Sequence, residues 1–384
     1  MRRLLALTVA CALLGAGPPV APANYNAFGV AVLQRLSAQA HDDNVFISPV
    51  SIGVALAMAA DGAAGTTRQA LVTGLHADDA DLSASNAALV ASLRANRDAQ
   101  VALADAIWLR QDIPPSSRYV ALLRDRYDAQ AQAVHFGAPS AAAAINDWVR
   151  RQTLGLIDDI VNATSPFDFA YLTNALAFKG AWTTPFDPHA TRPSPFTDAG
   201  GGTHNVSMML RTGSYEIADE NGYRALRLPY GKGGYAAYIL LPVTDDAAAL
   251  VRALTPSTFD EVSRAVRSEY VEVGVPRFTL QYGASLGDVL EQMGMGIAFS
   301  GNADFSAMHP PPPHLRIAQV LHKTYLRIDE AGTTAAAVTA VGMQMLAIRT
   351  SNTPPFIVNH PFVLAIRDEH TGALLFLGTI NSIP

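Results

Sequence analysis

The chain has 384 residues, of which 49% are hydrophobic, and its formal net charge is −6. This apolar content is ample for one large core, and the mild negative charge argues against a nucleic-acid partner. The single cysteine, Cys11, lies near the N-terminus, so the chain beyond it has no disulfide and no thiol chemistry. Beyond the N-terminal segment no run has the length of a membrane helix, and we expect no membrane partner.

The first 23 residues have the pattern of a secretory signal peptide. Two arginines open the segment, a short apolar run follows at residues 4–15, and Ala-Pro-Ala at 21–23 fits a cleavage site. The apolar run is too short to cross a bilayer. We therefore expect a signal at 1–23 and a mature single domain at 24–384. We expect this domain to be secreted, either to the extracellular space or to a periplasm.

A helix start is marked in residues 44–71. Ser48 can cap the helix with its side chain, and Pro49 suits the first helical position. Apolar residues follow at helical spacing, and Gly62 can end the helix. On local chemistry alone, Ser48 is an ordinary helix cap.

Alternating runs predict several strands in the middle of the chain. A strand is expected at 101–110, and another at 171–187 with a turn at Gly180. The remaining expected elements are a hairpin at 226–241, a strand at 271–280, and helices near 141–149 and 286–293. Strands and helices do not alternate strictly, so the pattern favours a mixed, largely antiparallel α+β fold.

Catalytic and metal motifs are scarce. Residues 283–287 match the nucleophile-elbow pattern Gly-x-Ser-x-Gly, but Ser285 followed by Asp288 is better explained as a helix cap. A hydrolase therefore stays a minor alternative. His309 and His314 flank a proline run without further ligands at suitable spacing, so we expect no metal and no cofactor.

The stretch from 321 to 362 is the most informative. It begins with a strand-like run at 325–328, and Gly332 then interrupts the pattern. Residues 333–340 are small or β-branched and carry no charge, which suits a segment that slides between strands. On composition alone, a buried helix or an alanine-rich linker explains this run equally well.

The flanks of this run resemble the serpins, the serine protease inhibitor family. Glu330, Gly332 and the small residues after them are similar to the serpin hinge. Residues 359–362, Asn-His-Pro-Phe, and 376–378, Phe-Leu-Gly, are similar to its C-terminal signature. Similar motifs occur in order over nearly all of 24–384, including one at 44–71.

The resemblance implies a fold with three sheets, about nine helices and an exposed reactive-centre loop at about 332–353. The implied hinge comprises Glu330, Gly332, Thr333, Thr334, Ala335, Ala336 and Ala337. The residues that match the polar cluster beneath the main sheet, called the shutter, and the top of that sheet are Ser48, Ser51, Asn174, His322 and Trp182.

The resemblance also implies suicide inhibition, not enzymatic turnover. A serine protease, or a cysteine protease, attacks the loop and forms an acyl-enzyme. The cut hinge then inserts into the main sheet as a new strand and drags the protease along. The implied partner is thus a protease held covalently by a monomeric inhibitor.

The resemblance also implies a cut bond between Leu346 and Ala347. In inhibitory serpins the cut residue lies about sixteen positions after the hinge glutamate, here Glu330, because insertion needs a strand of fixed length. Leucine suits chymotrypsin-, cathepsin G- or subtilisin-like pockets. The alternatives are Met345, in a shifted register, and Arg349, which would attract trypsin-like proteases.

Three residues depart from the family pattern. Ala331 stands where a charged residue is common, Thr334 where glutamate is common, and Val338 is bulkier than usual. None of them prevents burial by size or charge. A non-inhibitory serpin, acting as carrier or chaperone, is the alternative.

Overall fold

The computed structural model describes residues 21–80, 82–310, 315–333 and 353–384. Helices in these ranges are α1 (Asn26–Ala40), α2 (Pro49–Gly62), α3 (Gly65–Gly74), α4 (Leu82–Ala95), α5 (Ser117–Leu122), α6 (Pro139–Gln152), α7 (Ala247–Ala253), α8 (Thr258–Ala265) and α9 (Gly287–Leu290). Ser48 caps α2 by accepting a hydrogen bond from the backbone N–H of Ser51 at 3.0 Å, as its sequence context predicts.

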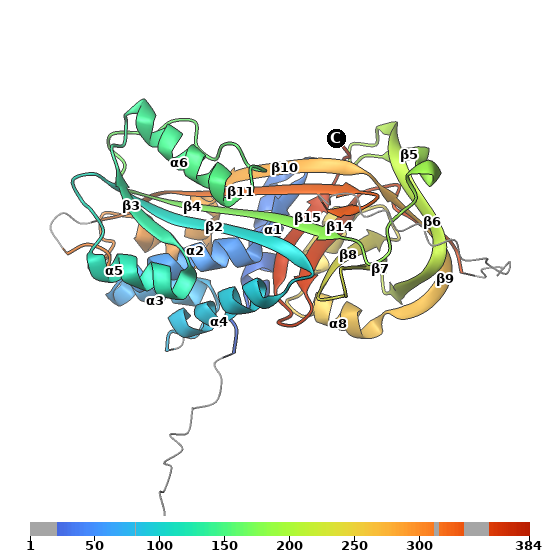
Figure 1. The fold of residues 1–384 in the computed structure, drawn as a ribbon, viewed down its shortest axis with the longest axis horizontal. Coiled ribbons are helices and arrows are strands. Elements are labelled where there is room, and N and C mark those ends of the chain that lie inside the picture. Colours follow the sequence, from blue (N-terminus) through green and yellow to red (C-terminus); the bar gives the residue numbers. More distant parts are fainter. Residues whose placement is uncertain (1–20, 81, 311–314, 334–352) are drawn as a thin grey trace, which may run out of the picture.

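Six strands form the main sheet, in the order β10-β11-β12-β4-β2-β3. They are β10 (Phe278–Ser285), β11 (Ile317–Asp329), β12 (Gly332–Thr333), β4 (Ala170–Ala181), β2 (Ala99–Arg110) and β3 (Gln130–Val134). Figure 1 shows this sheet running along the molecule, with α6 on one face and α2 against the other.

The other strands form a nine-stranded sheet in the order β1-β15-β14-β8-β7-β6-β9-β13, with β5 paired to β6. They are β1 (Val45–Ile47), β5 (Arg192–Thr197), β6 (Thr203–Glu220), β7 (Tyr223–Tyr230), β8 (Tyr235–Pro242), β9 (Arg267–Pro276), β13 (Phe356–Ile357), β14 (Phe362–Asp368) and β15 (Leu374–Ile380).

Two hydrogen-bonded sheets therefore appear in the described ranges, where three were expected. The reason is the 18-residue strand β6, which pairs with β5, β7 and β9 and so joins two groups of strands into one ladder. The mixed α+β prediction is confirmed. Most pairings are antiparallel, while β11 and β4 run parallel.

Alternate residues of β2 serve two different hydrophobic cores. Trp108 faces α6 and meets Trp148 edge to face, with 5.6 Å between the ring centroids. Ile107 points the other way, into the core that contains α2. This is the period-two burial that a sheet covered on both faces requires.

Two local predictions are wrong. Gly180 does not turn the chain: β4 continues to Ala181, and Gly180 lets the rings of Phe178 and Tyr230 approach the backbone. Ser285 is not a helix cap, because it is the last residue of β10 and is still paired with Leu321. The expected helix at 286–293 is present: α9 continues directly into a π-helical turn, η3 (Glu291–Met295), in which Gly294 breaks the helical conformation with a φ of 88°.

Candidate functional site

The hinge residues that the structure describes lie between two strands of the main sheet. Gly332 and Thr333 form β12, which pairs antiparallel with β11 on one side and with β4 on the other. Further along, β11 and β4 pair directly with each other as parallel neighbours. The chain thus enters the head of a seam between these two strands.

Aromatic side chains hold the start of β12 in place. Tyr230 and Thr333 share a hydrogen bond between their hydroxyl oxygens at 2.6 Å, and Thr333 is fully buried. Trp182 stacks on Tyr230 with 4.4 Å between the centroids and donates its indole N–H to the carbonyl of Asp329 at 2.9 Å. The backbone N–H of Trp182 also donates to Ala331 at 2.9 Å.

Glu330 is held by residues of the loops that connect the neighbouring strands. Its carboxylate accepts a 2.7 Å hydrogen bond from the hydroxyl of Thr191 and lies 3.4 Å from the guanidinium of Arg277. Its backbone carbonyl accepts from Phe186 at 2.9 Å. Each of these contacts stabilises the turn that leads into β12.

Gly332 is required by close packing. Its φ is 149°, and a Cβ atom placed there would lie 2.1 Å from the carbonyl oxygen of Gly180. Any larger residue must therefore displace β12 from β4.

Below the hinge, Asn174 and His322 are register partners across the seam. His322 is buried, and the N–H of Ser48 donates to its Nε2 at 3.1 Å. Since Nε2 accepts, Nδ1 carries the proton and donates to the side-chain oxygen of Asn174. Burial lowers the pKa of His322 to about 3, opposed by its hydrogen bond to Asn174, so the ring is neutral at physiological pH.

The structure therefore brings together Ser48, Asn174 and His322. Ser51 lies one step further away, and its hydroxyl donates to a carboxylate oxygen of Asp105 at 3.1 Å. Asp105, on β2, is the register partner of Asn174. The chain Asp105–Asn174–His322 thus crosses three neighbouring strands of the main sheet.

Asp105 was missed by the sequence reasoning. It is 3% exposed, no ion pair to it occurs among the described residues, and burial raises the pKa of its carboxyl well above the usual value, opposed by the Ser51 hydrogen bond. The signal was present: Asp105 is the one charged residue between Val101 and Ile107, on their face of the strand. A charge there is costly and requires a reason.

The remaining site predictions lie outside the described residues. They are Thr334, Ala335, Ala336, Ala337, Met345, Leu346, Ala347 and Arg349. His309, weighed as a metal ligand, donates from Nδ1 to the carbonyl of Pro114 at 2.7 Å. The described part of the chain contains no group of three or more metal-ligating side chains.

A family model described as serpin (serine protease inhibitor) matches residues 23–383. The chain belongs to the serpin family. Serpin-Z7 of Hordeum vulgare is 32% identical over 381 residues, which cover 93% of this chain and 95% of that relative. Members of this family are generally protease inhibitors and not catalysts.

Solved serpin structures share the fold. Human thyroxine-binding globulin matches with a TM-score of 0.87 and 28% identity, over 94% of this chain and 98% of that chain. Mouse protein-Z dependent protease inhibitor matches with a TM-score of 0.84 and 27% identity, over 94% and 96%. The predicted serpin fold is thereby confirmed. In this serpin, none of the described helices is long and apolar enough to cross a membrane.

Proposed function

We propose that this serpin is a suicide inhibitor of serine proteases that traps the acyl-enzyme by inserting its cleaved loop between β4 and β11. The observation that carries the proposal is the position of Gly332 and Thr333, which already pair with both strands. An antiparallel strand that starts there can extend only by separating the parallel β4–β11 pair below it.

The proposed chemistry is an interrupted proteolysis. The protease serine attacks the carbonyl carbon of Leu346, and the bond to the nitrogen of Ala347 breaks as that nitrogen takes a proton. The acyl group stays on the serine as an ester. Insertion then distorts the protease active site before water can hydrolyse the ester.

Insertion supplies the free energy. A strand of about 15 residues spans roughly 50 Å, and at about 1 kcal/mol for each new ladder hydrogen bond it contributes on the order of 10 kcal/mol. That is comparable with the stability of a whole domain. The uncut state must therefore be held by a kinetic barrier, and the contacts of Tyr230, Trp182 and His322 along the seam are suited to set it.

Leucine at the cut bond points to chymotrypsin-, cathepsin G- or subtilisin-like targets, and cysteine proteases of like specificity are further candidates. We propose that the inhibitor is secreted, on the strength of the N-terminal pattern, and that it acts as a monomer. Its similarity to mouse protein-Z dependent protease inhibitor supports an inhibitory role. Its similarity to a thyroxine-binding globulin complexed with thyroxine makes a carrier the second candidate.

The test is to mix the mature protein with chymotrypsin, subtilisin, elastase and trypsin separately, followed by denaturing gels and mass analysis of the released C-terminal peptide. A covalent band at the summed mass with a peptide starting at Ala347 supports the proposal. A peptide starting at Thr350 moves the cut bond to Arg349. Cleavage by every protease without a covalent band refutes inhibition and leaves the carrier.

Matched variants separate the two candidate bonds. Leu346→Ala removes the chymotrypsin-type bond and Arg349→Ala the trypsin-type bond. We expect Leu346→Ala to abolish the covalent complex with chymotrypsin, and Arg349→Ala to leave it unchanged. If Arg349→Ala abolishes the complex and Leu346→Ala leaves it unchanged, the cut bond follows Arg349 and the targets are trypsin-like proteases.

A further inference from the structure

A pocket of about 450 Å³ lies between the end of β4, the middle of β6 and the turn from β7 to β8. Strand registers explain its position: β5 pairs with β6 as far as Met208, and β7 pairs with it from Glu216 onwards. Between these two pairings no strand of the described ranges covers this edge of β6, and residues 183–184 line the pocket together with it. Side chains from this open edge form one wall.

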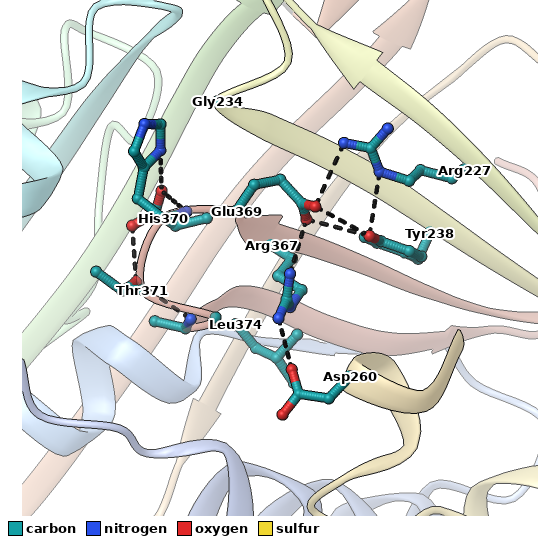
Figure 2. Close-up of polar contacts among 12 residues, drawn as sticks. Arg227, Gly234, Tyr238, Asp260, Arg367, Glu369, His370, Thr371 and Leu374 are labelled. Atoms are coloured by element: carbon teal, nitrogen blue, oxygen red, sulfur yellow. Dashed lines mark hydrogen bonds and ion pairs between the residues drawn. The ribbon is translucent and has the colours of Figure 1, made fainter. Parts of the chain in front are cut away.

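The pocket carries unneutralised positive charge. Arg211 and Lys232 line it, and neither makes an ion pair in the described part of the chain. Arg211 donates to the carbonyl of Pro185 at 3.5 Å and is close enough to Tyr215 to act on the pKa of its hydroxyl. The third cation, Arg227, is already paired with Glu216 and with Glu369. Figure 2 shows Arg227 directed at Glu369 and the hydroxyl of Tyr238. Two free cations thus remain for a ligand.

The same wall of the pocket contains the phenol hydroxyl of Tyr215, which has no hydrogen-bond partner among the described residues. Tyr215 is 8% exposed, and its buried hydroxyl makes no hydrogen bond, although an unpaired buried hydroxyl is costly. Burial raises the pKa of Tyr215 to about 12, with Arg211 opposing the shift, so the group stays a donor at physiological pH. The guanidinium of Arg211 lies 6.0 Å from the centre of this ring.

The rest of the lining is flat and partly apolar. Trp182, Leu228 and Pro229 contribute ring and aliphatic surface. Trp182 is fixed by its stacking on Tyr230 and by its hydrogen bond to Asp329, so this wall is preformed. A preformed pocket with apolar walls and few convergent polar groups is typical of a small-molecule site.

We propose that this pocket binds a small organic anion with a flat apolar body, whose carboxylate or sulfonate is held by Arg211 and Lys232 next to the hydroxyl of Tyr215. The apolar body lies along Trp182 and Pro229. Trp182 also contacts the hinge, so the ligand sits beside the segment that carries the proposed function, but its binding does not depend on that function.

Binding is tested with 2-naphthoate as the probe and its neutral amide as the control, by calorimetry on the mature protein. We expect naphthoate to bind and the amide to bind at least about tenfold more weakly, because the charge is lost. We also expect naphthoate to shift the indole N–H resonance of Trp182 and not those of Trp108 and Trp148, which pair on another face. Equal affinities, absent binding, or a shift at Trp108 would overturn the proposal.

Variants locate the anion. Arg211→Gln and Lys232→Gln are each expected to weaken the binding of naphthoate about fivefold. The control is Arg316→Gln, because Arg316 lies over the ring of Phe169 and outside the pocket, and it should leave the affinity unchanged. Tyr215→Phe should weaken binding and raise the midpoint of thermal unfolding, because it removes an unpaired buried hydroxyl. Unchanged affinity in Arg211→Gln and in Lys232→Gln contradicts the site.

Discussion

Asp105 and Asn174 lie directly opposite each other on β2 and β4, and each leaves one polar side-chain atom without a hydrogen-bond partner. The unpaired atoms are one carboxyl oxygen of Asp105 and the amide nitrogen of Asn174. Asn174 uses its other atom to bind His322 across the seam. The seam that would open in the proposed insertion is thus bordered by an incompletely paired polar network, which weakens the closed sheet beside it.

Replacing Asp105 by Asn should stabilise the uncut protein at neutral pH, by about 1–3 kcal/mol. The folded pKa of Asp105 is raised above its unfolded value, so the folded state binds the proton more tightly. Stability from this group is present below the unfolded pKa and lost as pH rises towards the folded pKa. We therefore expect the gain in Asp105→Asn to grow with pH.

Chemical denaturation between pH 4 and pH 8 measures this gain, with the exposed Asp158→Asn as the matched control. The free energy of unfolding of the control should equal that of the parent protein at every pH. A gain in Asp105→Asn that does not change with pH would show that the carboxyl of Asp105 is ionised in the folded state, contrary to the expectation.

His322 should act with the opposite sign. Its folded pKa, about 3, lies below its ordinary value of 6.5, so the unfolded chain binds the proton more tightly between these values. Stability from this group is complete above pH 6.5 and is lost as pH falls towards 3, by at most about 1.4 kcal/mol per pH unit. Nuclear magnetic resonance should show a neutral His322 ring at pH 5. A protonated ring at that pH would contradict the buried neutral tautomer.

A charge at Thr333 should convert inhibitor into substrate. Thr333 is fully buried against Tyr230, and a carboxylate there would have neither water nor a cation among its described neighbours. We expect Thr333→Glu to slow the first step of insertion, so that the protease hydrolyses the ester and leaves. Thr333→Ser keeps the hydroxyl and is the control. The measurement is the ratio of covalent complex to cleaved inhibitor; an unchanged ratio in Thr333→Glu would refute insertion through this seam.

Sequence patterns predicted the helices and strands more accurately than the contacts between them. The start of α2 at Ser48 follows from local capping chemistry, and the strand at β2 from alternation. The hydrogen bond between Asn174 and His322 joins residues 148 apart, and only the family resemblance pointed to it. Long-range pairing depends on sheet topology, which no local pattern records.

Local patterns also failed where tertiary pairing overrode them. Ser285 has the spacing of a helix cap, yet its backbone stays in the ladder opposite Leu321. Gly180 has the composition of a turn but serves close packing against Tyr230. The sequence shows Asp105 as a charged residue on an apolar strand face, but only the strand register shows that it lies opposite Asn174.

Gly332 provides the sharpest test of how the hinge is seated. Gly332→Ala places a methyl group 2.1 Å from the carbonyl oxygen of Gly180 and within 3 Å of backbone atoms of Ala181 and Trp182, which cannot move cheaply. We expect β12 to leave the head of the seam, which would raise hydrogen exchange at Thr333 and Trp182 and slow trapping. Gly301→Ala, where a Cβ meets no atom within 4 Å, is the matched control and should behave as the parent protein. Normal exchange and normal trapping in Gly332→Ala would show that pairing of β12 with β4 plays no part in loop insertion.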